Sequence, residues 1–440
     1  MATASPVFIH SLFRAGSTYL FNCFRRSVEK YCCYQEPLNE FLLNAGKNPE
    51  VLLNLHEDNT RHLRHPAIDL PYFYEFFPHA NWVGDSFREE FSYHDYFNDS
   101  PLESEALCRY LTGLAEVAKG RAVFQECRSP GRVSAIRRCL GGIHLFLWRN
   151  PWDQWWSYKV DSHFEICNLQ ILAAEPAPAV FLELRERLGF APQGRGVEHF
   201  VGQRLDAAGS YTLFFALWCH AMLTALPKCD FDINIDSLSH DETYRDALLV
   251  RLESHGITGL DFADCSIPSS LYGQRDQAFF TSLEEPVLEL FRLHGYSSTD
   301  LEKICGLREQ HRYCPDAKHW SSDKLGGEFD RLRQLIRRVE SELAFSQREG
   351  YQRNAELAAK EAERVAAEQA LRDEKAERID AEKALCAKEA ERQELASALD
   401  TKERALSQIL SSRYWRFGKP VRALEKHILK WRKNTQGVMR

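Results

Sequence analysis

The stretch VFIHSLFRAGSTYLFNCFRR, residues 7–26, decides the fold. Its apolar start, residues 7–10, predicts a buried strand, and the amphipathic pattern of residues 18–26 predicts a helix. The two are joined by a tight turn that contains Gly16. In this arrangement the helix N-terminus presents free backbone amides and the positive end of its dipole directly after the strand. The sequence therefore predicts a site for a phosphate or a similar anion.

Side chains of the turn strengthen this prediction. Arg14 supplies a fixed positive charge, and Ser17 and Thr18 supply hydroxyl donors. The alternative is an ordinary strand-to-helix turn in which Ser17 caps the helix and Arg14 is solvated. The GxxxxGK[ST] spacing of nucleoside triphosphatases is missing, which argues against a magnesium–ATP site.

A second motif, RNPWDQWWSY, occupies residues 149–158 and follows another apolar run. Pro151 and Asp153 favour a helix that starts at this point, which would bring Ser157 back beside Arg149. An arginine and a hydroxyl at the end of a strand predict a second anion site. A purely structural turn is the alternative.

Short apolar runs alternate with helical patterns over the first 300 residues, which predicts α/β layers around a parallel sheet. Residues 160–210 are richer in Ala, Pro, Gly and charge, and we expect a mobile helical insertion there. Residues 243–254 predict a helix that ends before Gly256. The expected strands are residues 7–10, 31–35, 122–125, 143–148 and 231–235.

Composition limits the class of protein. The 440 residues carry a net charge of −7 and are 44% hydrophobic, which excludes a wholly disordered or collagen-like chain and gives no reason to expect nucleic acid as a partner. The longest apolar stretch, residues 213–226, is too short for a membrane span. Thirteen cysteines without metal-site spacing, and a start without a signal-peptide pattern, predict reduced thiols in a cytoplasmic protein.

The C-terminal part has a different composition. Arg, Glu, Ala and Leu dominate from residue 328, and Leu357, Leu371, Leu385 and Leu399 mark a 14-residue repeat. The repeat predicts a coiled-coil homodimer or, alternatively, a solitary helix; either would serve as a spacer or assembly device. Residues 411–440 are basic and contain Trp415, Phe417 and Trp431. They predict peripheral contact with the inner face of a membrane or with an assembly complex, or a solvated helix end.

The two anion motifs together resemble the PAPS-dependent sulfotransferase family. FRAGSTYL is similar to the family's 5′-phosphosulfate loop, with Phe13 and Ala15 departing from the usual Pro and Ser. RNPWDQWWSY is similar to its 3′-phosphate element. Glu36-Pro37-Leu38 resembles the EPL segment of carbohydrate sulfotransferases. The likeness covers residues 6–260 and implies a P-loop-like three-layer sandwich with a central parallel sheet.

The resemblance also implies chemistry, namely transfer of a sulfuryl group from PAPS, without a metal, to a hydroxyl of a carbohydrate or glycolipid acceptor. Glu36 would take the hydroxyl proton and Arg14 would stabilise the charge that develops. Arg128 and Arg132 would lie near the cofactor or the acceptor. The family's late Arg-Lys-Gly loop has no clear counterpart, and residues 272–275 are the nearest candidate. The implied cofactor site consists of Arg14, Ala15, Gly16, Ser17, Thr18, Arg149 and Ser157.

Other features complete the sequence-based expectations. We interpret His10 as a core histidine, Glu40 as a solvated helix residue, and residues 233–238 as core and sheet. The tail also resembles a segment that follows coiled coils in bacterial glycosyltransferases of surface-polysaccharide pathways. Competing functions are a P-loop kinase-like phosphotransferase and a coiled-coil scaffold with an inactive nucleotide-binding domain. The expected parts are a sulfotransferase domain (1–310), a linker (311–350), a long helix or coiled coil (351–410) and the basic aromatic tail (411–440).

Overall fold

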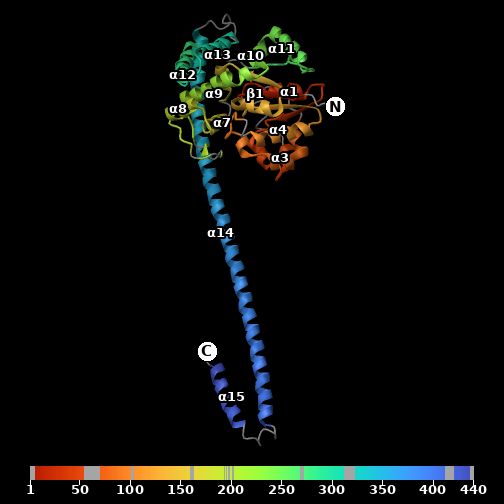
Figure 1. Ribbon diagram of the computed structural model, residues 1–440. Helices are drawn as coiled ribbons and strands as arrows, with labels where there is room; N and C mark the ends of the chain where they lie inside the picture. The colour runs from red at the N-terminus through yellow and green to blue at the C-terminus, as the bar shows by residue number, and fades with distance from the viewer. Residues whose placement is uncertain are drawn as a thin grey trace. The chain divides into compact units, whose positions relative to one another are not determined.

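The computed structural model describes residues 5–53, 70–100, 104–158, 163–192, 194, 196, 199–200, 203–267, 272–311, 323–411 and 421–436. Five strands form one sheet in the order β2-β3-β1-β4-β5, and every pairing is parallel (Figure 1). Their bounds are β1 Val7–Ser11, β2 Tyr31–Gln35, β3 Arg121–Glu126, β4 Ile143–Trp148 and β5 Phe231–Asn234. The predicted α/β class, the parallel sheet and all five predicted strands are confirmed.

Helices connect and follow these strands, as right-handed crossovers between parallel strands require. The α-helices are α1 Ser17–Arg25, α3 Ala80–Ser86, α4 Glu105–Val117, α5 Val133–Leu140, α6 Pro151–Tyr158, α7 His163–Leu172, α8 Ala179–Arg187, α9 Ala207–Thr224, α10 Ile235–His240, α11 Glu242–Ser254, α12 Gln274–Leu293, α13 Ser298–Gln310, α14 Asp323–Ser411 and α15 Val421–Gln436. Short 3₁₀ helices are η1 Glu40–Asn44, η2 Pro49–Leu53, η3 Tyr74–His79, η4 Glu89–Phe91, η5 Pro130–Arg132 and η7 Leu226–Lys228.

Alternate residues of the strands pack on opposite faces of the sheet, because successive side chains of a strand point in opposite directions. Val7 and Ile9 of β1 belong to one apolar cluster with residues of α1 and α11. Phe8, between them, belongs to a second cluster with residues of η3 and α4. The sheet therefore lies between two layers of helices.

Residues 160–210 contain α7, α8 and the start of α9, joined by segments that are not α-helical where the structure describes them, and they do not form a separate insertion. Cys167 and Ile171 of α7 and Phe181 of α8 are fully buried in the largest apolar cluster of the chain, together with most of α9. By length and composition the 22 residues Ala207–Lys228 could cross a membrane, yet 72% of the apolar window is buried inside this core. Such burial is typical of the central helix of a globular domain.

Not all cysteines of the chain are reduced. Cys108 of α4 and Cys139 of α5 form a disulfide, so the prediction of thirteen reduced cysteines is wrong for this pair. The two helices pack against each other, which brings together side chains that are 31 residues apart in sequence. The remaining cysteines among the described residues are free, and most are buried.

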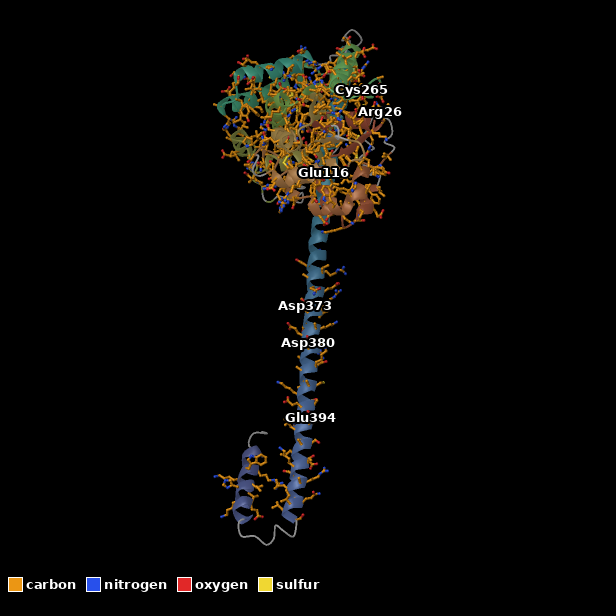
Figure 2. All side chains as sticks on the ribbon, turned by 45° about the vertical axis from the view of Figure 1, so that its right-hand side comes forward. Arg26, Glu116, Cys265, Asp373, Asp380 and Glu394 are labelled. Carbon is orange, nitrogen blue, oxygen red and sulfur yellow. A yellow bond between two sulfur atoms is a disulfide. The ribbon has the colours of Figure 1, made fainter. Side chains whose placement is uncertain are left out.

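The chain divides into two units, Met1–Tyr351 and Gln352–Arg440. In the second unit, side chains such as Asp373, Asp380 and Glu394 project from α14 (Figure 2). Residues of the 14-residue repeat are about half exposed, Leu371 by 52% and Leu385 by 60%. Arg364–Glu368 and Arg378–Glu382 are among the ion pairs that join successive turns. Ion pairs between successive turns stabilise a solvent-exposed helix. The coiled-coil dimer stays a prediction.

Two buried histidines, on the neighbouring strands β1 and β4, are hydrogen-bonded to each other. His10 Nε2 lies 2.8 Å from His144 Nδ1, and His10 Nδ1 lies 2.7 Å from Ser129 Oγ. Burial lowers the pKa of His10 well below its usual value and lowers that of His144 to about 4. His10 is therefore the core histidine that we expected, and both imidazoles stay neutral near pH 7.

We expect acid to destabilise the fold through His144. Its pKa is lower in the folded chain than in the unfolded chain, so its contribution to stability is complete above pH 6.5 and is lost as the pH falls towards 4. Between pH 7 and 4.5 this loss amounts to about 2.5 kcal/mol. Urea unfolding at pH 7 and pH 4.5 should show that the free energy of unfolding falls less in His144→Gln than in wild type. His255→Gln, which changes a surface histidine, should lose as much as wild type does. An equal loss in wild type and His144→Gln would contradict the prediction.

Candidate anion site at the carboxyl edge of the sheet

The loop between β1 and α1 has an unusual backbone. Arg14 has φ 62° and Gly16 has φ 87°, both in the left-handed region. Gly16 is the N-cap of α1, and its carbonyl accepts from the amides of Tyr19 and Leu20 at 3.0 and 3.2 Å. Because glycine has no side chain to cap the helix, the first amides of α1 are left for another acceptor.

Close packing fixes Gly16 in place. A Cβ atom at this position would lie 2.7 Å from Cγ1 of Ile235, at the start of α10. Both the left-handed backbone and this contact therefore require glycine. Ser17, one residue later, is buried with its hydroxyl 3.5 Å from Sγ of Cys127, so the alternative in which Ser17 caps the helix is wrong.

Arg14 contacts one residue of the second motif and one residue of α7. Its Nε donates to Oγ of Ser157 at 2.9 Å, and its guanidinium lies 5.1 Å from the centre of the Phe164 ring. We expected Ser157 beside Arg149, but the structure bonds it to Arg14. The loop after β1 and helix α6, which follows β4, are thus joined by a hydrogen bond from a charged donor to a hydroxyl.

Arg149 lies buried at the end of β4. Its Nε donates to Oδ1 of Asp236 at 3.2 Å, and the backbone amide of Asn150 donates to Oδ2 at 2.8 Å. Trp218 Nε1 donates to the Arg149 carbonyl at 3.1 Å. Burial raises the pKa of Asp236 to about 6, against the opposing effect of the Arg149 charge. The Asp236 carboxylate therefore orients Arg149, which is the second candidate anion-binding residue.

Glu36 comes directly after β2 and also has a left-handed backbone, with φ 43°. Its Oε1 accepts from the Tyr72 hydroxyl at 3.0 Å, and the Thr18 hydroxyl is a further neighbour of that tyrosine. Its Oε2 accepts from Arg128 Nη1 at 2.7 Å and from Asn39 Nδ2 at 2.9 Å. The carboxylate is therefore tied both to the first loop and to the end of β3.

Arg128 is the buried cation beside Glu36, and its side chain is only 1% exposed. It also bonds Glu40 at 3.0 Å, so Glu40, whose side chain is 35% exposed, is partly solvated and has a charged partner as well. Its guanidinium lies between the rings of Phe13 and Tyr93, at 5.3 and 4.8 Å. The carboxyl groups of Glu36, Glu40 and Glu126 and two aromatic rings therefore surround this one positive charge.

The nearby carboxyl groups respond differently to this environment. Burial raises the pKa of Glu40, but the Arg128 charge and hydrogen bonds outweigh it, so the pKa lies below its usual value. Burial raises the pKa of Glu126, at the end of β3, to about 7. The site thus contains a carboxylate that stays ionised and a carboxyl group that titrates near neutrality.

Arg132 and the candidate late loop, residues 272–275, were also expected near the site. Arg132 donates to backbone carbonyls of residues 91, 92 and 95, which is a structural role. In the candidate late loop, the Tyr272 hydroxyl donates to Asp153 of the second motif at 2.7 Å, and Arg275 is exposed. Within the described residues, no three His, Cys, Asp or Glu side chains come together as in a metal site.

No protein-family model and no curated protein matches this sequence. The geometry itself singles out the site. Arg14 and Glu36 are the two non-glycine residues with positive φ in the described part of the chain. Such strain typically gathers at functional sites, where the surrounding structure holds it in place.

Replacing Gly16 should show what the Ile235 contact adds. We expect Gly16→Ala to lower the free energy of unfolding by about 2–3 kcal/mol, because alanine would adopt a left-handed backbone and displace Ile235. Gly189 is a matched control, since it has φ 61° but no atom within 4 Å of an added Cβ. Gly189→Ala should cost about 1 kcal/mol. Equal losses in urea unfolding would show that the contact with Ile235 is not a constraint.

Proposed function

We propose that this chain is a sulfotransferase that moves a sulfuryl group from PAPS to a hydroxyl of a carbohydrate or glycolipid acceptor. The observation that carries the proposal is the strained backbone at Arg14 and Glu36, which follow β1 and β2 at the same edge of the sheet. One is a fixed cation beside an uncapped helix start, and the other is a buried carboxylate. Sulfuryl transfer requires this combination, an anion binder and a proton acceptor.

The donor set fits a nucleotide with phosphates at two positions. The first group of donors is Arg14 and the amides of Ala15, Gly16, Ser17 and Thr18. The second is Arg149 and its turn, at the end of the adjacent strand β4. The strand order changes direction between β1 and β4, which is where open parallel sheets bind their ligands. PAPS carries its phosphosulfate and its 3′-phosphate at opposite ends of one ribose, so each end can meet one group.

Different residues of the chain would stabilise the developing charge and hold the cofactor. PAPS would supply the activated sulfuryl group. Arg14 and the loop amides would stabilise negative charge on its oxygens without reorganisation, because the loop is already fixed. Arg149 and Ser157 would hold the 3′-phosphate end, with Ser157 also orienting Arg14.

Glu36 would accept the proton of the acceptor hydroxyl as the new bond to sulfur forms. Hydrogen bonds from Arg128, Tyr72 and Asn39 fix the orientation of this carboxylate. The Thr18–Tyr72 neighbourhood places this carboxylate next to the first anion group. Proton acceptor and anion binder thus come from two loops joined by side chains.

The other parts of the proposal concern architecture and location. We infer a P-loop-like three-layer domain, a coiled-coil homodimer through α14, and a cytoplasmic protein that modifies surface polysaccharide or glycolipid. The basic tail would contact the inner face of the membrane or an assembly complex; the segment 412–420 of that tail lies outside the described residues. No residue of the β1–α1 loop is a lysine, which weighs against a kinase-like phosphotransferase.

Transfer of label from [³⁵S]PAPS tests this function. The wild-type chain, supplied with free hexoses, neutral oligosaccharides and a lipid-linked sugar, should release PAP and label an acceptor. Glu36→Gln should lower kcat by about 10²–10³ while PAP binding is kept, since only the proton acceptor is removed. Glu116→Gln, at an exposed position of α4 marked in Figure 2, is the matched control and should leave the rate unchanged.

Two results would contradict the proposal. Transfer of label from [γ-³²P]ATP but not from PAPS would favour the phosphotransferase. PAPS turnover that is equal in wild type and Glu36→Gln would remove Glu36 from the chemistry.

A further inference from the structure

The two residues that follow β5, Ile235 and Asp236, contact both candidate anion loops. β5 ends at Asn234, whose side chain accepts from the Ser237 amide at 2.7 Å and caps α10. This cap fixes Ile235 and Asp236 in the first turn of the helix. Both side chains are buried, Ile235 at 0% and Asp236 at 2% exposure.

Asp236 acts on the loop after β4. Its two oxygens accept from the Arg149 side chain and the Asn150 amide, so one carboxylate holds both the guanidinium and the turn. Because the two oxygens of Asp236 bind different groups, the carboxylate cannot rotate without breaking its hydrogen bond to Arg149 or to the Asn150 amide. From the sequence alone, residues 233–238 are interpreted as core and sheet, with no role at the site.

Ile235 acts on the loop after β1. Its side chain fills the space into which a Cβ on Gly16 would point, with Cγ1 at 2.7 Å and Cδ1 at 3.2 Å. The anion loop cannot move towards β5 without displacing this side chain. Adjacent residues of one capped helix therefore contact both halves of the site.

We propose that Ile235 and Asp236 form a positioning element that sets the spacing of the two anion groups, with Asp236 aiming Arg149 at the nucleotide 3′-phosphate. This inference rests on the proposed function. Asp236 itself is a positioning residue, since its contacts are with Arg149 and the Asn150 amide. Removing its charge should weaken recognition of the 3′-phosphate and spare recognition of the 5′-phosphate.

Calorimetric titration of the full chain with PAP and with AMP, which lacks the 3′-phosphate, separates the two groups. We expect Asp236→Asn to weaken PAP binding about tenfold, as loss of a positioning contact commonly does, and to change AMP binding less than twofold. In an Arg149→Ala background the same change should have no further effect, because Asp236 acts through Arg149. Asp232→Asn, on the preceding strand β5, is the matched control and should bind both nucleotides as wild type does.

Each outcome is decisive. PAP binding by wild type that Asp236→Asn leaves unchanged, or equal losses of PAP and AMP, would overturn the inference while the proposed function stands. A folded wild-type chain that does not bind PAP would overturn both. If Asp236→Asn does not fold, Asp236→Glu, which keeps the charge but displaces the carboxylate, should show the same selective loss of PAP, and equal losses of PAP and AMP in this variant would again overturn the inference.

Discussion

Parallel pairing of β1 with β3 on one side and β4 on the other is the constraint on which the candidate site depends. Parallel strands end at one edge of a sheet, so the loops after all five strands converge there. Each loop brings a different group: Arg14 after β1, Glu36 after β2, Arg128 after β3, Arg149 after β4 and Asp236 after β5. An antiparallel neighbour would have sent its loop to the opposite edge, and the charges would not meet.

Convergence of so many charges is stable only because each is matched. Arg128 is almost completely buried and shares its charge between Glu36 and Glu40, while Arg149 is paired with Asp236. A single unpaired charge at such depth would cost several kcal/mol, roughly what one destabilising mutation removes. Arg14 has a different setting, since it is bonded to a hydroxyl and stacked on an aromatic ring.

Local features of this chain were predictable and distant contacts were not. The five strands follow from apolar runs, and the anion loop follows from a strand, a glycine and a helix start. Asp236 was missed because its partner Arg149 is 87 residues away, and a pattern of residue types does not give strand order. The same holds for Arg128 and Glu36, which are 92 residues apart, and for the disulfide. One signal was available for Asp236: an acidic residue directly after an apolar strand lies at the functional edge of a parallel sheet.

We propose that the β1–α1 loop binds the sulfate-bearing end of PAPS and is not an ATP site. Calorimetry of the purified chain with PAP, and with ATP in the presence and absence of magnesium, compared between wild type and Arg14→Ala, tests it most directly. The account predicts PAP binding that is tighter than ATP binding, insensitive to magnesium, and weakened at least tenfold by Arg14→Ala, because a charge-assisted contact to phosphate is lost. Magnesium-dependent binding of ATP that exceeds binding of PAP, or PAP binding that Arg14→Ala leaves unchanged, would contradict it.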